Sequence, residues 1–148
     1  ERSDFLPFKV LSKMPIAMTA HILYSNIDKN LPITQSKKAY EYIRHVIKYE
    51  GILLSDDIDM FALSGSIKSK VNSIINAGFD IILHCSGNIE DIKQVLLNTP
   101  LVNKNLYSKW KLSLDKIDNV CIGSNKKTYK KEINKIIYNL LKIEPDYY

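Results

Sequence analysis

The clearest structural signal lies between residues 51 and 60, where the sequence reads Gly51-Ile52-Leu53-Leu54-Ser55-Asp56-Asp57-Ile58-Asp59-Met60. The apolar residues 52–54 and Ser55 predict a short buried strand, and three carboxylates follow it within four residues. Functional groups of α/β proteins gather at the carboxyl ends of the strands, so this position favours a catalytic carboxylate. A polar strand-to-helix turn with an aspartate as helix N-cap explains the same residues, and the pattern alone leaves both interpretations open.

Two further apolar runs predict strands on either side of this one. Residues 16–20 form a run that ends at His21, and residues 80–85 form the other. Apolar residues recurring near a period of 3.6 predict amphipathic helices over residues 35–49, 67–77 and 89–98. Strands that are apolar on both faces and separated by such helices indicate βαβ units and a parallel sheet. A sheet of three strands has two open edges, which need more strands or a partner.

The pattern changes after Pro100. Residues 101–117 predict a helix or a helical hairpin, and residues 118–125 predict a polar break. Residues 128–143 then predict an amphipathic helix that packs on its own domain or on another chain. We therefore place a boundary between residues 1–117 and a helical tail of residues 118–148.

Composition excludes several classes of protein. The 148 residues are 45% hydrophobic and 25% charged, which is typical of one globular domain. No apolar run approaches the roughly 18–20 residues that span a bilayer, so we expect no membrane partner. The net charge of +5 comes from dispersed lysines, and even the basic segment 126–131 fits a solvated helix start better than a nucleic-acid site.

The two cysteines, Cys85 and Cys121, lack the spacing of metal ligands. Cys85 ends an apolar run, and we predict buried free thiols in a reducing, cytoplasmic compartment. Neither a metal nor a cofactor is predicted. A nucleic-acid-binding domain stays the weakest of the functional hypotheses.

Several segments share their order and spacing with one known family across about residues 4–117. They are Asp4-Phe5-Leu6-Pro7-Phe8-Lys9, Met18-Thr19-Ala20-His21 with Tyr24 and Asp28, Ile43-Arg44, residues 51–60, and Ala77-Gly78-Phe79-Asp80-Ile81-Ile82-Leu83-His84-Cys85. Their combination resembles the bacterial β-N-acetylglucosaminidases of glycoside hydrolase family 3. The Ser-Asp-Asp-x-x-Met element after a strand is the most specific single motif.

The resemblance implies an α/β fold built as part of a TIM-like (β/α)8 barrel. The three predicted strands would be the last three βα units of that barrel. Full barrels of this kind run to about 250 residues, so residues 1–117 would be the C-terminal half, followed by a C-terminal helical extension. This arrangement explains the two open edges of the predicted sheet.

The resemblance also implies a retaining hydrolase that removes terminal non-reducing N-acetyl-β-D-glucosamine from peptidoglycan fragments in cell-wall recycling. Asp56 falls on the family's nucleophile, whose carboxylate attacks the anomeric carbon and forms a covalent intermediate. His21 is expected to form a polar wall of the sugar pocket, or only to orient a loop or Asp56. Met60 is expected beneath the sugar, although core packing would explain it too. Asp57 and Asp59 are expected to support or cap the site.

Other family segments are missing from this sequence. Members carry a Lys-His-Phe-Pro-Gly-His-Gly segment and a downstream Asp-x-His dyad that supplies the general acid/base, and neither occurs here. General acid/base catalysis is commonly worth about 10²–10⁴ in rate. The expected partners are therefore N-acetylglucosaminyl muropeptides and the N-terminal half of the barrel. The alternative is an inactive remnant that acts as a structural or interaction module. His45 and His84 are expected to be structural.

Overall fold

The computed structural model describes residues 4–120. The chain forms two compact units, residues 1–114 and residues 115–148. The first unit contains the whole sheet and every side chain of the predicted site. The only described element that reaches into the second unit is helix α5 (Lys104–Val120).

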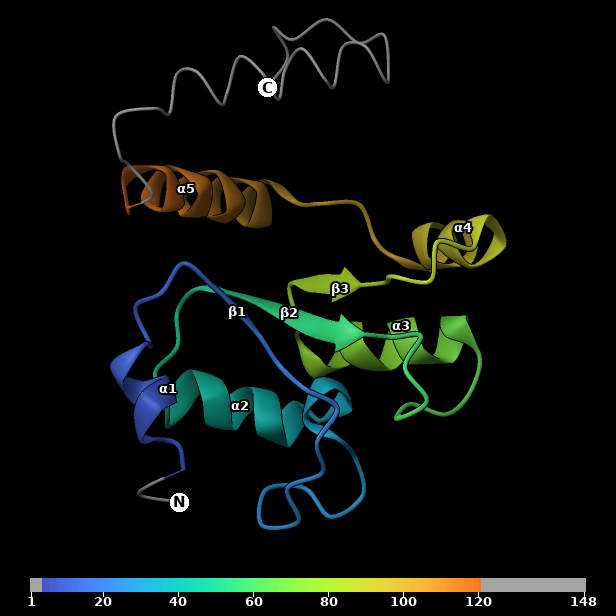
Figure 1. The fold of residues 1–148 in the computed structure, drawn as a ribbon, viewed down its shortest axis with the longest axis horizontal. Coiled ribbons are helices and arrows are strands. Elements are labelled where there is room, and N and C mark those ends of the chain that lie inside the picture. The colour runs from blue at the N-terminus through green and yellow to red at the C-terminus, as the bar shows by residue number, and fades with distance from the viewer. Residues whose placement is uncertain (1–3, 121–148) are drawn as a thin grey trace, which may run out of the picture. The chain divides into compact units, whose positions relative to one another are not determined.

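The sheet is parallel, as the sequence predicts. Strands β1 (Ile16–Met18), β2 (Ile52–Asp57) and β3 (Ile81–Leu83) lie in the order β1-β2-β3 (Figure 1). Ile16 pairs with Ile52, and Leu54 pairs with Ile81. The central strand β2 continues through Asp57, two residues further than the predicted strand.

That extension bears on one of the two interpretations of the aspartate cluster, the helix N-cap. Asp56 and Asp57 belong to the strand itself, and the next helix, α3 (Ile67–Ala77), begins only after a loop. Ser66 caps this helix by accepting a hydrogen bond from Ser69 N. The prediction of an aspartate N-cap at this turn is therefore wrong.

Three crossover helices follow the strands. Helix α2 (Lys37–His45) joins β1 to β2, α3 joins β2 to β3, and α4 (Ile89–Asn98) follows β3. Helix α2 is shorter than predicted because residues 46–50 turn back toward β2 and include Lys48 at φ 61°. Helix α3 ends at Gly78, whose φ of 111° is the left-handed geometry that favours glycine.

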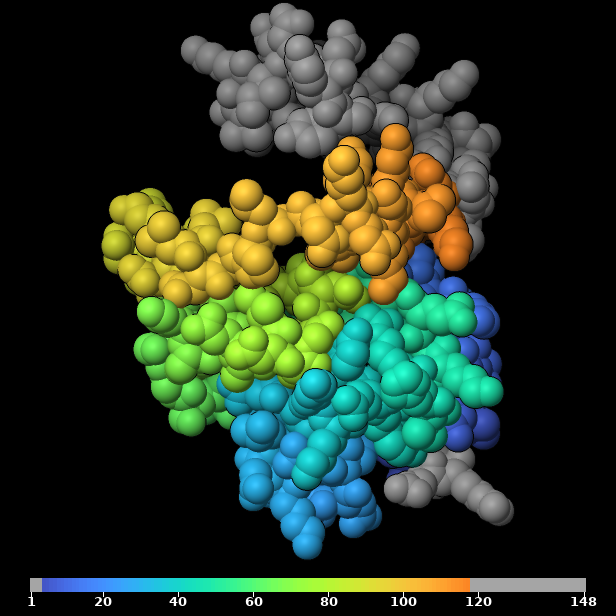
Figure 2. All heavy atoms as spheres, turned by 180° about the vertical axis from the view of Figure 1, so that it is seen from behind, coloured from blue at the N-terminus to red at the C-terminus, as the bar shows by residue number. Residues whose placement is uncertain are grey.

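The core lies between β2 and the helices that cover one side of the sheet (Figure 1). Ile52 and Leu53 of β2 are fully buried, as are Val71 and Ile74 of α3. Helix α4 lies against α3 (Figure 2) but buries none of its residues completely. The centre of the sheet is thus well packed, whereas its flanks expose apolar surface.

Several elements differ from the predictions. The short helices α1 (Leu6–Val10) and η1 (Ile33–Gln35) were not anticipated, because five and three residues are too few to show a helical period. Helix α5 is a single helix, which excludes the hairpin, and it covers the first three residues of the predicted break at 118–125. The rest of that break, the basic segment 126–131 and the predicted helix 128–143 lie outside the described residues.

Cys85 is exposed, so the prediction of a buried thiol at this position is wrong. The reason is that β3 ends at Leu83, and Cys85 therefore lies in the loop that follows. Cys121 lies outside the described residues. Within residues 4–120, no helix is both long enough and apolar enough to cross a lipid bilayer.

Candidate active site

Asp56 lies near the carboxyl end of the central strand, where its side chain is half-buried. Its Oδ1 accepts a hydrogen bond from Asp57 N at 2.9 Å. Among the described residues, this is the one hydrogen bond found for the carboxylate, and the other oxygen, Oδ2, has none. The geometry leaves one oxygen of the carboxylate available to a ligand.

Ser55 controls how the two neighbouring strands meet beside Asp56. The regular register of β2 and β3 is interrupted between Leu54 and Asp57. In the gap, Leu83 N donates to Ser55 Oγ at 3.1 Å, and Ser55 Oγ donates to the backbone oxygen of Asp56 at 2.8 Å. The serine is completely buried. Such irregularities re-aim side chains next to active sites, and no local sequence signal marks Ser55 for this role.

Asp57 fastens the loop after β2 to the loop after β3. Its Oδ1 accepts from Asp59 N at 3.1 Å and from Cys85 N at 3.0 Å. One carboxylate oxygen thus holds two segments that are far apart in the sequence. This is the kind of supporting contact expected of Asp57.

His21 uses both ring nitrogens inside the protein. Nδ1 lies 2.7 Å from Thr34 Oγ1, and Nε2 lies 2.8 Å from the backbone oxygen of Asp57. Thr34 is completely buried. A role in orienting the loop after β1 needs no rearrangement of these contacts, whereas a hydrogen bond to a sugar would have to replace one of them.

The loop between β1 and α2 is stiffened by Asp28. Its carboxylate accepts from Ser36 Oγ at 2.7 Å and from Asn30 N at 3.0 Å. The hydrogen bond from the Asn30 backbone, helped by Ser36, lowers the pKa of Asp28 below its ordinary 3.8. Ser36 also caps α2 by accepting from Ala39 N at 3.1 Å.

A cavity of about 430 Å³ lies beside β1 and is lined mainly by apolar residues of α1, β1 and α2. Among its described lining residues, Asp56 is the one carboxylate. His21 and Met60 do not line it, and Met60 is 44% exposed in the loop after β2. The structure therefore brings Asp56 to the cavity, and it places the other predicted substrate contacts outside it.

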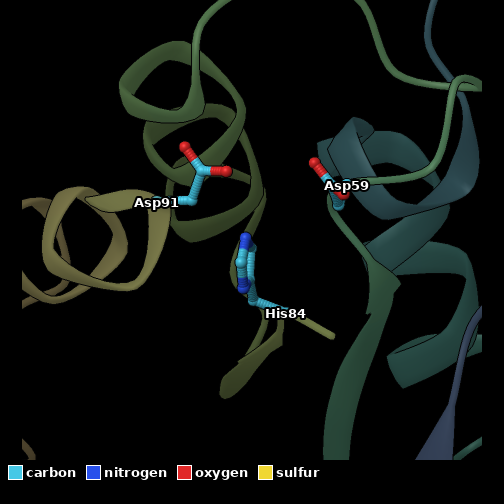
Figure 3. A group of neighbouring side chains, drawn as sticks. All are labelled: Asp59, His84 and Asp91. Atoms are coloured by element: carbon cyan, nitrogen blue, oxygen red, sulfur yellow. The ribbon is translucent and has the colours of Figure 1, made fainter. Parts of the chain in front are cut away.

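Three further side chains gather at the same end of the sheet. Asp59, His84 and Asp91 each offer one possible ligand atom, and these atoms all lie within 4.8 Å of one another (Figure 3). Asp59 was expected to support the site, and His84 was expected to be structural. This is the group of described residues that could hold a metal ion.

A three-stranded parallel sheet with helices between its strands defines an α/β protein, a class in which ligands commonly bind at the carboxyl ends of the strands. Residues 1–111 match the family described as "Glycosyl hydrolase family 3 N terminal domain". The chain belongs to this family. The match confirms the resemblance read from the sequence segments.

Individual relatives agree with this assignment. The β-hexosaminidase of Alkalilimnicola ehrlichii is 33% identical over 107 residues, which cover 68% of this chain and 30% of the relative. Native NagZ from Neisseria gonorrhoeae superimposes with a TM-score of 0.62 at 27% identity, over 74% of this chain and 32% of that protein. The β-N-acetylglucosaminidase from Thermotoga maritima gives 0.55 at 31% identity, over 76% and 27%. The chain thus spans about a third of the length of these relatives.

Proposed function

We propose that this chain supplies the nucleophile-bearing part of a retaining β-N-acetylglucosaminidase. The substrate would be a peptidoglycan fragment with a terminal non-reducing N-acetyl-β-D-glucosamine, hydrolysed in the cytoplasm during cell-wall recycling. The observation that carries the proposal is Asp56 near the end of β2: it is a lining residue of the cavity beside β1, and one oxygen of its carboxylate is unengaged among the described residues. Membership of the family and the β-hexosaminidase names of its relatives support the class of substrate.

In the proposed reaction, Asp56 forms a covalent bond to the anomeric carbon in the first step, and this bond breaks in the second. A carboxylate oxygen attacks the anomeric carbon while the glycosidic oxygen leaves with a proton from a general acid. Water then attacks the anomeric carbon and gives a proton to the same group, now acting as base, while the bond between the sugar and Asp56 breaks. Because the sequence lacks the Asp-x-His dyad, the acid would come from the N-terminal half of the barrel.

The neighbours of Asp56 would keep its carboxylate in place during these steps. The hydrogen bond from Asp57 N fixes Oδ1, and buried Ser55 holds the backbone oxygen of Asp56. A nucleophile held by short backbone contacts loses little freedom when it reacts, which is how orientation contributes to rate.

The open flanks of the sheet support the need for the other half of the barrel. Within the described residues, β1 and β3 each pair only with β2. Apolar side chains near β1 stay exposed, including Met18 at 58% and Leu23 at 49%. We propose that strands of the N-terminal half pair with these edges and cover the apolar cavity beside β1.

The test is a complementation assay. The 148-residue chain is co-expressed with a complementary N-terminal barrel half from a relative, and release of the chromophore from a chromogenic N-acetylglucosaminide is measured. The Asp56→Asn variant should lose at least about 10⁴-fold in kcat, since removal of a nucleophile commonly costs this much or more. Glu50→Gln, an exposed change at the opposite end of the sheet, is the control.

Two results would contradict the proposal. Activity that survives Asp56→Asn would show that another group attacks the sugar. A complex that forms and folds but never hydrolyses the substrate would favour the inactive structural module instead.

A further inference from the structure

We propose that Asp59, His84 and Asp91 form a binding site for a divalent transition-metal ion of the zinc class. The three residues come from the loop after β2, the loop after β3 and the first turn of α4, and their side chains converge (Figure 3). The proposal does not depend on the hydrolase activity, because it concerns a different group of side chains.

The distances fit a site that needs only small side-chain movements to close. The ligand atoms lie within 4.8 Å of one another. Zinc–ligand distances of about 2.0–2.2 Å place neighbouring ligands of a tetrahedral ion about 3.4 Å apart. Asp59 is exposed, and among residues 4–120 no hydrogen bond or ion pair holds the carboxylate of Asp59 or Asp91. Rotation of these carboxylates can therefore bring the atoms together without breaking another contact.

The second observation is the state of the His84 ring. Its Nδ1 is buried and has no hydrogen-bond partner among the described residues. Its Nε2 lies 3.3 Å from Ser86 Oγ, which is long for a hydrogen bond. His21 has both nitrogens at 2.7–2.8 Å from protein oxygens, so the two histidines differ in what they leave available. Figure 3 shows the ring nitrogen farther from the backbone, Nε2, directed toward Asp91, and a neutral imidazole is the commonest protein ligand for metals.

The backbone around the three ligands is already fixed. Asp57 Oδ1 binds the backbone N–H groups of Asp59 and Cys85, which anchors the first two loops to each other. Asn88 caps α4 and accepts from Asp91 N at 3.4 Å. Because the backbone is already held in place, less conformational entropy is lost when the ion binds.

The ligand types favour the zinc class. Magnesium and calcium prefer sites built from oxygen alone, whereas an imidazole favours zinc and neighbouring transition metals. Two carboxylates would balance the charge of a divalent ion, and three protein ligands leave one position for water. Since the three residues come from the loop after β2, the loop after β3 and α4, bound metal would cross-link these three segments.

The experiment is an isothermal titration calorimetry measurement in which zinc chloride is added to the 148-residue chain in a buffer treated to remove other metals. Cobalt(II), added in place of zinc, reports coordination through its visible absorption bands. We expect one ion per chain. His84→Ala and Asp91→Asn should each weaken zinc binding strongly, because each removes a metal ligand. The loss should exceed the about 10–100-fold that follows when only a hydrogen-bond partner of a metal ligand is removed. His45→Ala and Glu90→Gln, which lie outside the group, should leave the affinity unchanged.

The exposed thiol of Cys85 is the competing ligand in this region. Cys85→Ser should bind zinc as the parent chain does. The proposal is overturned if the parent chain binds no zinc, if Asp91→Asn binds as tightly as the parent, or if Cys85→Ser alone abolishes binding. Far-ultraviolet circular dichroism of each variant separates a lost ligand from a lost fold, and the near-isosteric Asp91→Asn keeps the test decisive if His84→Ala fails to fold.

Discussion

Asp80 at the amino end of the sheet and Asp56 at the carboxyl end differ in how their carboxylates are paired. At the amino end, Asp80 Oδ2 accepts from Arg44 at 2.8 Å and from Leu53 N at 2.9 Å, and Lys109 Nζ lies 3.6 Å away. At the carboxyl end, Asp56 accepts a single hydrogen bond, from the next residue. A carboxylate held by two cations and a distant backbone N–H stabilises the fold, whereas one that no described cation pairs can act on a ligand.

Arg44 is the centre of the amino-end network. Besides Asp80, its guanidinium donates to the backbone oxygens of Tyr49 and Gly51 at 3.0 and 2.7 Å. It also lies 5.0 Å from the centre of the Tyr40 ring. One side chain thus joins α2, the turn before β2 and the start of β3, which matches the stabilising role of this face in barrel proteins.

The largest expected effect follows from removing that centre. The side chains of Arg44 and Asp80 are only 13% and 19% exposed, so Arg44→Met leaves a nearly buried carboxylate without its main partner. We expect the free energy of unfolding to fall by about 3–5 kcal/mol in urea denaturation. Lys13→Met breaks the exposed pair with Glu50 and should cost less than about 1 kcal/mol. Both pairs lie at the amino end and differ in burial, so equal losses would mean that burial does not decide what an ion pair contributes here.

Unlike Asp56, His21 at the carboxyl end has both of its ring nitrogens bonded. His21→Ala leaves buried Thr34 without a partner and should cost about 2 kcal/mol. His45→Ala, on the exposed side of α2, is the matched control and should change stability by less than about 0.5 kcal/mol. If His21→Ala leaves the free energy of unfolding unchanged, the ring is not needed for the fold and is available for the predicted sugar contact.

Two glycines with positive φ allow the backbone at the two ends of the sheet to be compared. Gly78, before β3, has φ 111°, and an added Cβ would lie 2.9 Å from the Tyr40 ring. Gly87, after β3, has φ 72° with nothing within 4 Å. Gly78→Ala should therefore cost about 2 kcal/mol and Gly87→Ala about 1 kcal/mol, measured as shifts of the urea midpoint at constant slope. The reverse order would contradict the tighter packing of the amino end.

Acid should lower the free energy of unfolding through the protonation of Asp28. Because its folded-state pKa is lowered, the ionised carboxylate stabilises the protein above pH 3.8, and this contribution is lost as the pH falls from 3.8 through the folded-state pKa. Asp28→Asn should flatten that part of the stability curve, whereas Glu50→Gln should not. If the stability of Asp28→Asn changed with pH as that of the parent chain does, the hydrogen bonds of Asp28 would have to persist in the unfolded chain.

The smallest expected effect concerns the candidate nucleophile itself. Asp56→Asn keeps an oxygen for the hydrogen bond from Asp57 N and removes a charge that no described cation balances. The free energy of unfolding should stay within about 0.5 kcal/mol of the parent chain. A large loss would give Asp56 a structural role comparable to that of Asp80.

Local patterns were enough to predict the framework. The helices over residues 67–77 and 89–98 have the predicted bounds, and the three strands appear where apolar runs lie between helices. Periodicity reports which side of an element is buried, and that information is carried by neighbouring residues. The place of Asp56 near a strand end followed from the same local pattern.

Other features depended on residues far apart in the sequence. Asp57 bonds to Cys85, Ser55 bonds to Leu83, and the proposed metal ligands come from three elements. The exposure of Cys85 was mispredicted because the true end of β3 is set by its pairing with β2. Local patterns in the sequence were sufficient for the order of strands and helices and for the family motif. Which polar groups are paired became visible only in the folded chain, since hydrogen bonding between distant segments requires that the chain first bring them together.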